Sequence, residues 1–245
     1  MPIRVGIIIQ CRLNSKRLPG KTLLRLGKRT VIEHTFKNAI KSGLVNDCIV
    51  VIPETPENYL LEDYLKSKSI PYALGSENNL VSRHLLAARA NNFDYIVRIP
   101  ADNPLPHYEE VDRIIHHHIS HNTNGFSTNL TQIFNSGYPD GIGAEVFSTE
   151  LLGKIDQDLA SVEDLEHVHL NFFNYTTQRI RRQDVSISTV NCPPNFARPD
   201  IRLDINTYSD FQYFEDMFNY FQDDNFDITD IIKWHDSVNR SKHDL

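Results

Sequence analysis

Cysteine and long apolar runs are scarce in this chain of 245 residues, and each scarcity excludes a class of protein. The three cysteines, Cys11, Cys48 and Cys192, lie far apart and match no zinc-site spacing. We therefore expect reduced thiols in a cytoplasmic protein, not a disulfide framework. The apolar runs extend over only a few residues, so we expect no membrane insertion. The first residues also lack the layout of a signal peptide.

Positive charge is the minority sign in this sequence. Lys and Arg number 25 against 32 Asp and Glu, which gives a formal net charge of -7. This balance argues against a protein that holds nucleic acid by bulk electrostatics, so we expect no nucleic-acid partner. No Ser-His-Asp or Cys-His pattern is visible either, which indicates chemistry without a protein nucleophile.

The positive charge that is present gathers in one loop near the N-terminus. In the stretch IIIQCRLNSKRLPGK, an apolar strand leads directly into Arg12, Lys16, Arg17 and Lys21. Cations this close repel one another unless an anion lies among them, and open α/β sheets bind ligands at the carboxyl ends of their strands. The loop therefore predicts a phosphate site, with a solvated basic loop as the open alternative.

Strand and helix patterns alternate along the first half of the chain. β-branched runs such as 5–11 and 47–53 predict strands, and the amphipathic stretches between them predict helices, as in a parallel α/β sheet. Residues 125–199 are less regular, which indicates a partly antiparallel flap or a dimerisation arm. Residues 200–221 return to a strand followed by a helix. We expect an α/β fold of one domain, 1–245, with an inserted arm.

The basic loop also approaches a Walker A motif. Residues Ser15–Thr22 read SKRLPGKT, which ends as G-x-x-x-x-G-K-[ST] requires. Ser15 stands where the first glycine belongs, and Gly27 falls where the P-loop helix would still continue. We therefore do not expect a P-loop.

An aspartate follows another predicted strand, in the sequence VRIPADNPL. Asp102 lies just beyond that strand, at the same sheet edge as the basic loop if the two strands are parallel. Magnesium takes oxygen ligands and is usually held by one or two carboxylates together with substrate phosphate. Asp102 is thus a candidate metal ligand, although Asp-Asn-Pro is also good turn chemistry.

These segments resemble a known family. A strand followed by Q-x-R-x-x-S-x-R-L-P-G-K is similar to the nucleotidyltransferases of the spore coat polysaccharide biosynthesis protein F type, relatives of the synthetases that make CMP-Kdo and CMP-sialic acid. The resemblance covers most of the chain and recurs, in order, in five further segments. These are Gly75–Ala88, Tyr95–Leu105, Tyr138–Phe147, Glu163–Val168 and Asp200–Phe211.

The resemblance implies a Rossmann-like nucleotide-diphospho-sugar transferase fold, with a mixed, mainly parallel sheet flanked by helices. Its first loop would wrap the triphosphate of CTP. Carried over by position, the nucleotide would be bound by Arg12, Ser15, Arg17 and Lys21 at its phosphates, and by the backbone around Gln10 and Cys11 together with Arg83 at its base. The residues implied in catalysis are Arg12, Lys21 and Asp102, and the implied cofactor is Mg²⁺.

The second metal ligand departs from the family pattern. A strand that ends in aspartate followed by threonine usually supplies it, but here the matching position is Asn206, with Asp204 two residues earlier. Residues two apart on a strand point to the same face, so both side chains could reach the site. An asparagine oxygen can also bind magnesium. Both residues stay candidates, and the departure leaves open a non-catalytic homologue.

The acceptor side is implied mainly by the irregular region. By resemblance, the candidate acceptor-binding residues are Asp140, Glu145, Glu166 and His167, with Arg98 able to pair with an anionic acceptor. Other interpretations are open, because Asp140-Gly141 is a common tight-turn pair and Glu166 fits an exposed helix face.

The sequence therefore predicts a Mg²⁺-dependent cytidylyltransferase. An oxygen of a sugar or sugar acid would attack the α-phosphorus of CTP and release pyrophosphate, for the synthesis of a surface polysaccharide or glycoconjugate. One alternative is a nucleotide-sugar-dependent glycosyltransferase, which normally carries an Asp-x-Asp motif where this chain has Ala-Asp-Asn. The other is a non-catalytic nucleotide-binding homologue.

A homodimer is also expected, through the segment 125–199. This segment carries Phe172, Phe173 and Tyr175 close together, and an aromatic cluster in a flap needs a surface that covers it. The resemblance implies the same contact, because members of the family dimerise through the corresponding region.

Overall fold

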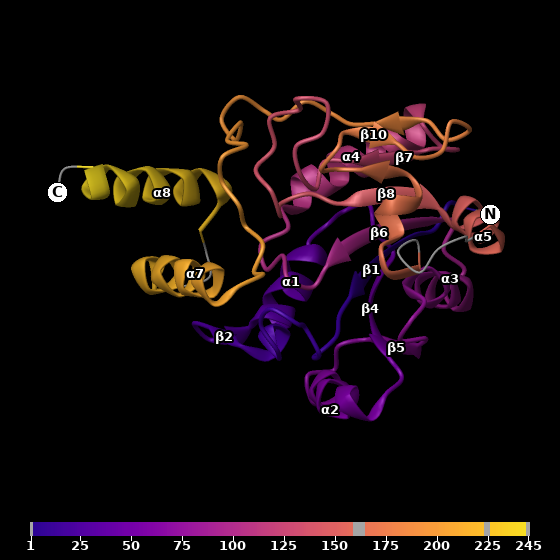
Figure 1. Ribbon diagram of the computed structural model, residues 1–245, viewed down its shortest axis with the longest axis horizontal. Coiled ribbons are helices and arrows are strands. Elements are labelled where there is room, and N and C mark those ends of the chain that lie inside the picture. The colour runs from indigo at the N-terminus through magenta and orange to yellow at the C-terminus, as the bar shows by residue number, and fades with distance from the viewer. Residues whose placement is uncertain (1, 159–164, 223–225, 244–245) are drawn as a thin grey trace.

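A seven-stranded mixed sheet forms the centre of the structure, a computed structural model that describes residues 2–158, 165–222 and 226–243 (Figure 1). In sheet order its strands are β11 (Ile187–Ser188), β7 (Phe126–Thr128), β8 (Glu145–Ser148), β6 (Tyr95–Pro100), β1 (Val5–Gln10), β4 (Asp47–Pro53) and β5 (Tyr72–Gly75). β1 lies parallel to β4 and β6, whereas β8 lies antiparallel to β6 and β7. The expected mixed, mainly parallel sheet is confirmed.

The central strands form where β-branched residues follow one another. β1 and β4 bury nearly all of their side chains, including Ile7, Ile8, Ile9 and Val50, because helices cover both faces of the sheet. Burial of each such side chain contributes about 1.5–3 kcal/mol. These strands are therefore a firm support for the loops that follow them.

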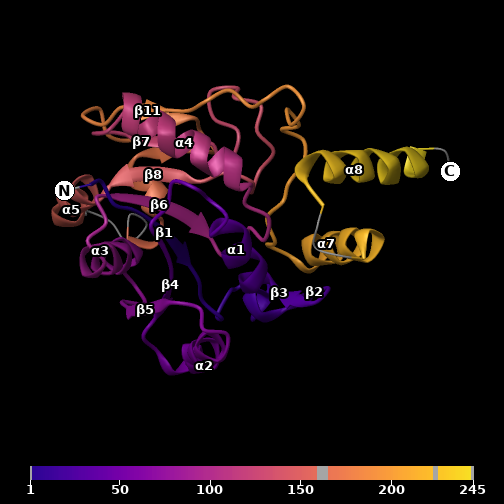
Figure 2. The same cartoon turned by 180° about the vertical axis from the view of Figure 1, so that it is seen from behind.

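Helices form the two outer layers (Figure 2). α1 (Val31–Ala39), α2 (Tyr59–Ser67) and α4 (Tyr108–His121) pack on one face of the sheet, and α3 (Leu80–Ala90) and α5 (Thr149–Gln157) on the other. A capping box begins α1: Thr30 Oγ1 accepts from the Glu33 N–H, and the Glu33 carboxylate accepts from the Thr30 N–H. This cap fixes where the chain turns back onto the sheet after the basic loop.

The segment 125–199 is partly built into the central sheet. It supplies β7, β8 and β11, and it adds a two-stranded ribbon of β9 (Phe173–Asn174) and β10 (Arg179–Ile180) after the 3₁₀ turn Val168–Asn171. Residues 159–164 lie outside the described residues, and with them Glu163 and Asp164 of the resembling segment Glu163–Val168. The antiparallel character expected for this region is present in β7, β8 and the ribbon.

The aromatic cluster of this segment is covered by its own chain. Phe172 and Phe173 are fully buried, and the Phe172 ring stacks on Phe126 with centroids 4.6 Å apart. Tyr175 is half-buried and packs against the same core. The expectation that this aromatic cluster needs a second subunit to cover it is therefore wrong. The dimer itself stays a prediction.

The C-terminal helices α7 (Tyr208–Phe221) and α8 (Ile228–His243) extend past the edge of the sheet, as both views show (Figures 1 and 2). They share a hydrophobic cluster with Leu26 of the short hairpin formed by β2 (Arg25–Leu26) and β3 (Arg29–Thr30). Among the helices of the described residues, none is both long and apolar enough to cross a membrane.

The segment before α7 is extended but forms no regular strand, so the strand expected there is wrong. Residues 200–206, all of them described, contain a single isolated bridge, between Arg202 and Asp140. Their side chains still alternate: three aliphatic residues are buried, and Asp204 and Asn206 lie on the opposite side. The backbone bonds of the segment go to two different loops, and therefore no continuous ladder forms.

Candidate active site

The order of the strands creates a switch point beside β1. The chain leaves β1 for β4 and β5 on one side, and it returns to β6 on the other side. Gln10 at the end of β1 pairs with Pro100 at the end of β6, so the loops after these strands begin side by side. Open α/β sheets bind ligands at such a point. The basic loop and the loop that carries Asp102 therefore meet here.

Backbone contacts shape the basic loop. The Leu13 N–H donates to the Asn58 side chain at 3.0 Å, and the Gly20 N–H donates to the Leu13 carbonyl at 2.8 Å. Gly20 has a φ of 71°, in the left-handed region that glycine adopts most easily, so the chain turns inward at Lys21. A 3₁₀ turn, Lys21–Leu23, and the β2–β3 hairpin follow in place of a long helix, which agrees with the expectation of no P-loop.

The Lys21 ammonium lies where these two loops meet the segment before α7. Its Nζ is 2.5 Å from Asp102 Oδ2, 2.6 Å from the Ile205 carbonyl oxygen and 3.3 Å from Asn206 Oδ1. Lys21 is only 8% exposed. The Ile205 N–H in turn donates to the Asp102 carbonyl at 2.9 Å. The structure thus brings Lys21, Asp102 and Asn206, all predicted from the sequence, around one positive charge.

The two candidates for the second metal ligand bond different cationic side chains. Asn206 Oδ1 accepts from Lys21 and, at 2.6 Å, from Arg17, so it faces the basic loop. The Asp204 carboxylate accepts from Arg202 at 3.1 and 3.2 Å, and also from the Asn206 amide nitrogen. The asparagine oxygen therefore shares the Lys21 centre, whereas Asp204 is paired with an arginine.

This centre fits a divalent cation. The Asp102 carboxylate and the carbonyl oxygens of Ile205 and Asn206 are hard oxygen donors, which magnesium and manganese prefer, and they already converge on a cation. In the part of the chain that the structure describes, no three His, Cys, Asp or Glu side chains form a metal cluster. Amide and carbonyl oxygens, together with substrate phosphate, would therefore complete the coordination.

Asp140 adds a third carboxylate near this centre. Its N–H donates to the Ile201 carbonyl at 3.0 Å, and its carbonyl accepts from the Leu203 N–H at 2.9 Å. Burial, followed by the negative charges of Asp204 and Asp102, raises the pKa of Asp140 to about 6. The structure thus groups Asp140, which the resemblance assigns to the acceptor, with the carboxylates of the metal side.

The residues expected to face the base are mostly enclosed. Cys11 is buried, its N–H donates to the Val51 carbonyl at 3.0 Å, and burial raises the pKa of its thiol to about 12. Arg83 on α3 is buried as well, with its Nε donating to the Ser76 carbonyl at 2.8 Å and its Nη2 to the Glu77 carbonyl at 3.1 Å. Both residues are thus held firmly beside the loop.

The remaining phosphate candidates lie on the outer side of the loop. Arg12 and Arg17 are exposed, and Ser15 is partly exposed. Burial and then the positive charge of Arg12 lower the pKa of Arg83 to about 10. The loop therefore presents a concentration of positive charge that a polyanion would neutralise.

Arg98 and Glu145 form a buried ion pair. They lie opposite each other in the antiparallel register of β6 and β8, and the guanidinium donates directly to the carboxylate. Arg98 Nε also donates to Gln10 Oε1 at 2.7 Å, and the Tyr175 hydroxyl donates to Glu145 Oε1 at 2.7 Å. The two charged side chains are 5% and 0% exposed. In this structure Arg98 and Glu145 are paired with each other, and their contact with an acceptor stays a prediction.

Glu166 and His167 are both exposed. The His167 ring lies 5.8 Å from the ring of His169, which stacks on Tyr175 at 4.9 Å. Burial lowers the pKa of His169 to about 4. His167 is therefore connected, through the rings of His169 and Tyr175, to the Arg98–Glu145 pair.

Sequence reasoning missed two residues that hold others in place. Tyr175, considered only as an aromatic surface residue, bonds Glu145, and Arg202 bonds Asp204. Arg202 had a detectable signal, since it lies two residues before Asp204 in an alternating segment. Tyr175 had none, because its partner lies 30 residues away in the chain.

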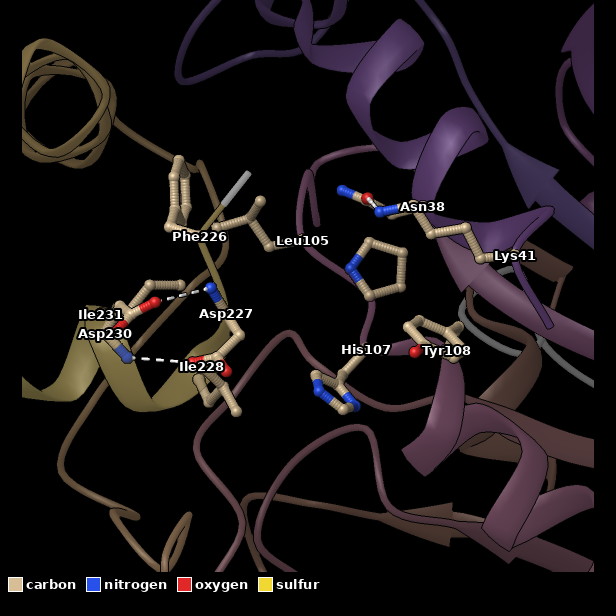
Figure 3. Close-up of a pocket in the computed structure, with 11 residues that line it drawn as sticks. Asn38, Lys41, Leu105, His107, Tyr108, Phe226, Asp227, Ile228, Asp230 and Ile231 are labelled. Atoms are coloured by element: carbon tan, nitrogen blue, oxygen red, sulfur yellow. Dashed lines mark hydrogen bonds between the residues drawn. The ribbon is translucent and has the colours of Figure 1, made fainter. Parts of the chain in front are cut away.

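A cavity of about 620 Å³ lies apart from these groups, between α1, the start of α4 and the start of α8 (Figure 3). Lys41 and Tyr108 line one side, and Asp227 and Ile231 line the other. The Asp227 carboxylate already accepts from N–H groups at the start of α8. None of the predicted site residues lines this cavity.

The comparisons with known proteins agree on one family. The sequence profile of the cytidylyltransferases matches residues 6–225. An uncharacterized protein of Methanocaldococcus jannaschii is 29% identical over 229 residues, which cover 94% of this chain and 89% of that protein. Spore coat polysaccharide biosynthesis protein SpsF of Bacillus subtilis is 25% identical over 209 residues, covering 84% and 82% of the two chains.

A solved structure shows the same architecture. It is that of a cytidylyltransferase from Leptospira borgpetersenii serovar Hardjo-bovis, with a TM-score of 0.84, 26% identity, and coverage of 98% of this chain and 96% of that one. The profile match includes the central sheet, both loops at the switch point and the segment that carries Asn206. The chain therefore belongs to the cytidylyltransferase family.

Proposed function

We propose that this protein is a Mg²⁺-dependent cytidylyltransferase that transfers CMP from CTP to a sugar or sugar acid and releases pyrophosphate. The observation that carries the proposal is the Lys21–Asp102–Asn206 centre at the switch point, beside a loop with three further cationic residues. Family membership supports the cytidylyl group, and the name of the Bacillus subtilis relative supports a role in surface polysaccharide or glycoconjugate synthesis.

The basic loop is proposed to hold the triphosphate. The guanidinium groups of Arg12 and Arg17 can each pair with two phosphate oxygens, the Ser15 hydroxyl can donate, and Lys21 adds a compact charge. These groups would stabilise the charge that develops on departing pyrophosphate. The backbone at Gln10 and Cys11, together with Arg83, would face the base.

Asp102 and Asn206 are proposed to hold the metal. Asn206 is preferred to Asp204 because its oxygen faces Lys21, while Asp204 is bonded to Arg202. When bound, Mg²⁺ supplies charge neutralisation for the triphosphate and polarises the phosphate under attack. The chain itself contributes mainly orientation of CTP and preorganised positive charge.

Asp140 is proposed to bind the attacking hydroxyl group of the acceptor and to accept its proton. A carboxyl group with a pKa of about 6 is deprotonated near neutral pH and is more basic than an ordinary aspartate, which suits a general base. Glu166 and His167 are proposed to contact a more distant part of the acceptor. Arg98 and Glu145 would act indirectly, because Arg98 holds the Gln10 side chain at the end of β1.

The test is pyrophosphate release from CTP and Mg²⁺ with a panel of sugar acids and neutral sugars. We expect release that requires both CTP and one class of acceptor, and that Asp102→Asn nearly abolishes. Turnover of nucleotide sugars without pyrophosphate would indicate a glycosyltransferase. Binding of CTP without turnover of any acceptor would favour a non-catalytic homologue.

A further inference from the structure

The ammonium group of Lys21 has all of its hydrogen-bonding capacity in use. An ammonium carries three donors and no acceptor. The three acceptors around Nζ are Asp102 Oδ2 at 2.5 Å, the Ile205 carbonyl at 2.6 Å and Asn206 Oδ1 at 3.3 Å. Its side chain is 10% exposed, so this charge rests almost entirely on the three oxygens.

The same oxygens are those that fit a divalent metal ion. Magnesium binds its oxygen ligands directly, so an ion bound to Asp102 and Asn206 would compete with Nζ for the same oxygens. Two cations at one point also repel each other strongly in a partly buried site. The metal and the Lys21 ammonium therefore exclude each other.

A second cation of the basic loop makes a similar contact. Arg17 Nη2 donates to Asn206 Oδ1 at 2.6 Å, which anchors the middle of the loop onto the same side chain. Arg17 is exposed, whereas Lys21 is enclosed. If Arg17 and Lys21 both lose their hydrogen bonds to Asn206, their positive charges can instead bind an anion next to the loop.

We propose that Lys21 is a place-holder for the metal ion, which moves from Asp102 to a phosphate of the nucleotide when metal and nucleotide bind together. This inference rests on the proposed function of the site. A metal ion alone must displace an ammonium that then has no anionic partner, so it binds weakly. With a triphosphate present, the displaced ammonium gains a partner, and each ligand raises the affinity for the other by the same factor.

The experiment measures Mn²⁺ binding without any nucleotide, from the electron paramagnetic resonance signal of the free ion. The variant is Lys21→Met, which keeps a chain of similar length and removes the ammonium. The matched control is Lys16→Met, which removes one positive charge from an exposed position of the same loop. We expect Lys21→Met to bind Mn²⁺ at least about tenfold more tightly than wild type, a coupling of the usual size, and Lys16→Met to change the affinity by less than about threefold.

Lys21→Gln serves as the second variant if Lys21→Met does not fold, as judged by circular dichroism. Equal Mn²⁺ affinity in wild type and the Lys21 variant, or an equal gain in Lys16→Met, would overturn the exchange. The readout needs neither CTP nor turnover. A protein that shows the tenfold gain but never releases pyrophosphate would therefore contradict the proposed function and leave the exchange standing.

Discussion

At the scale of single residues, the candidate site depends on how buried charges are paired. Lys21 is enclosed with Asp102, and Arg98 with Glu145, whereas Arg202, the partner of Asp204, is 64% exposed. In an enclosed pair, removal of one partner leaves the other charge unpaired, which costs more than the pair contributes. Substitutions at these positions should therefore affect both activity and folding.

Asp102→Asn keeps the shape of the side chain but removes the charge that faces Lys21. We expect turnover to fall about a hundredfold or more, because the lost carboxylate is the proposed ligand of the Mg²⁺ that neutralises the reacting phosphates. The free energy of unfolding should also fall, by about 1–3 kcal/mol, since the Lys21 ammonium then has only neutral acceptors. Pyrophosphate release and urea denaturation measure the two effects. Full pyrophosphate release at saturating CTP and Mg²⁺ would contradict the proposed mechanism.

The choice between Asn206 and Asp204 can be decided by a pair of alanine variants. Because Asn206 Oδ1 faces Lys21, we expect Asn206→Ala to lower turnover at least about tenfold more than Asp204→Ala. Asp204→Ala should act mainly through Arg202, with a modest change. The dependence of rate on Mg²⁺ concentration should shift in Asn206→Ala. The reverse order of the two variants would make Asp204 the ligand.

Asp140 should make stability depend on pH in a direction set by its raised pKa. The value is about 6 in the folded protein against an ordinary 3.8, so the stability present below pH 3.8 is lost as the pH rises through 6. Asp140→Asn cannot ionise, so it does not lose stability over this pH range. We expect the variant to be more stable than wild type by about 1–3 kcal/mol at pH 8 and nearly equal at pH 4. Urea denaturation at both pH values, without added metal or nucleotide, gives the comparison.

At the scale of elements, the sequence predicted what depends on local pattern. The β-branched runs and amphipathic stretches of the first half identify β1, α1, β4, α3, β6 and α4. β7 and β8 were not resolved as strands because they have only three and four residues and depend on pairing with distant segments. The Arg98–Glu145 pair is unpredictable for the same reason, since it requires the register between β6 and β8.

Prediction of the site was limited in a similar way. Parallel strands place the basic loop and Asp102 at one sheet edge, and this follows from the sequence alone. The direction of Asn206 and Asp204 does not, because it depends on Arg17, Lys21 and Arg202, which compete for their oxygens. For residues 200–206 the predicted alternation of side chains was correct although the predicted strand was not. The reason is that backbone contacts with loops also keep this segment extended.

One glycine joins two elements of the site, and its substitution tests their contact. Gly141 follows Asp140, has a φ of 94°, and a Cβ there would lie 2.4 Å from the Leu203 carbonyl oxygen. We expect Gly141→Ala to push the segment before α7 away from Asp102 and to lower both Tm and turnover. The matched control is Gly137→Ala, where φ is 85° but the nearest atoms are at 3.6 Å. Both share the cost of a left-handed alanine, about 1 kcal/mol, so equal effects would argue against the contact.

At the scale of the whole molecule, a negative chain presents a positive site. The net charge of -7 discourages non-specific binding of polyanions, while the basic loop concentrates four cations at one end of β1. The result favours a small, highly charged anion over nucleic acid. Recognition of one nucleotide among several would then come from the proposed contacts of the base with Arg83 and the backbone at Cys11.

CTP with Mg²⁺ should therefore stabilise the folded protein more than ATP or GTP with Mg²⁺ does. All three nucleotides carry the same triphosphate, so any difference reports contacts with the base. A ligand present at a hundred times its Kd adds about 2.7 kcal/mol to the free energy of unfolding. For a chain of this length, that corresponds to a rise in Tm of about 5–10 °C. Thermal unfolding followed with each nucleotide at equal concentration measures the ranking, and Asp102→Asn, which should lose most of the shift for all three, is the control. An equal or larger shift with a purine nucleotide would contradict selective recognition of cytosine, because the phosphate contacts alone would then account for binding.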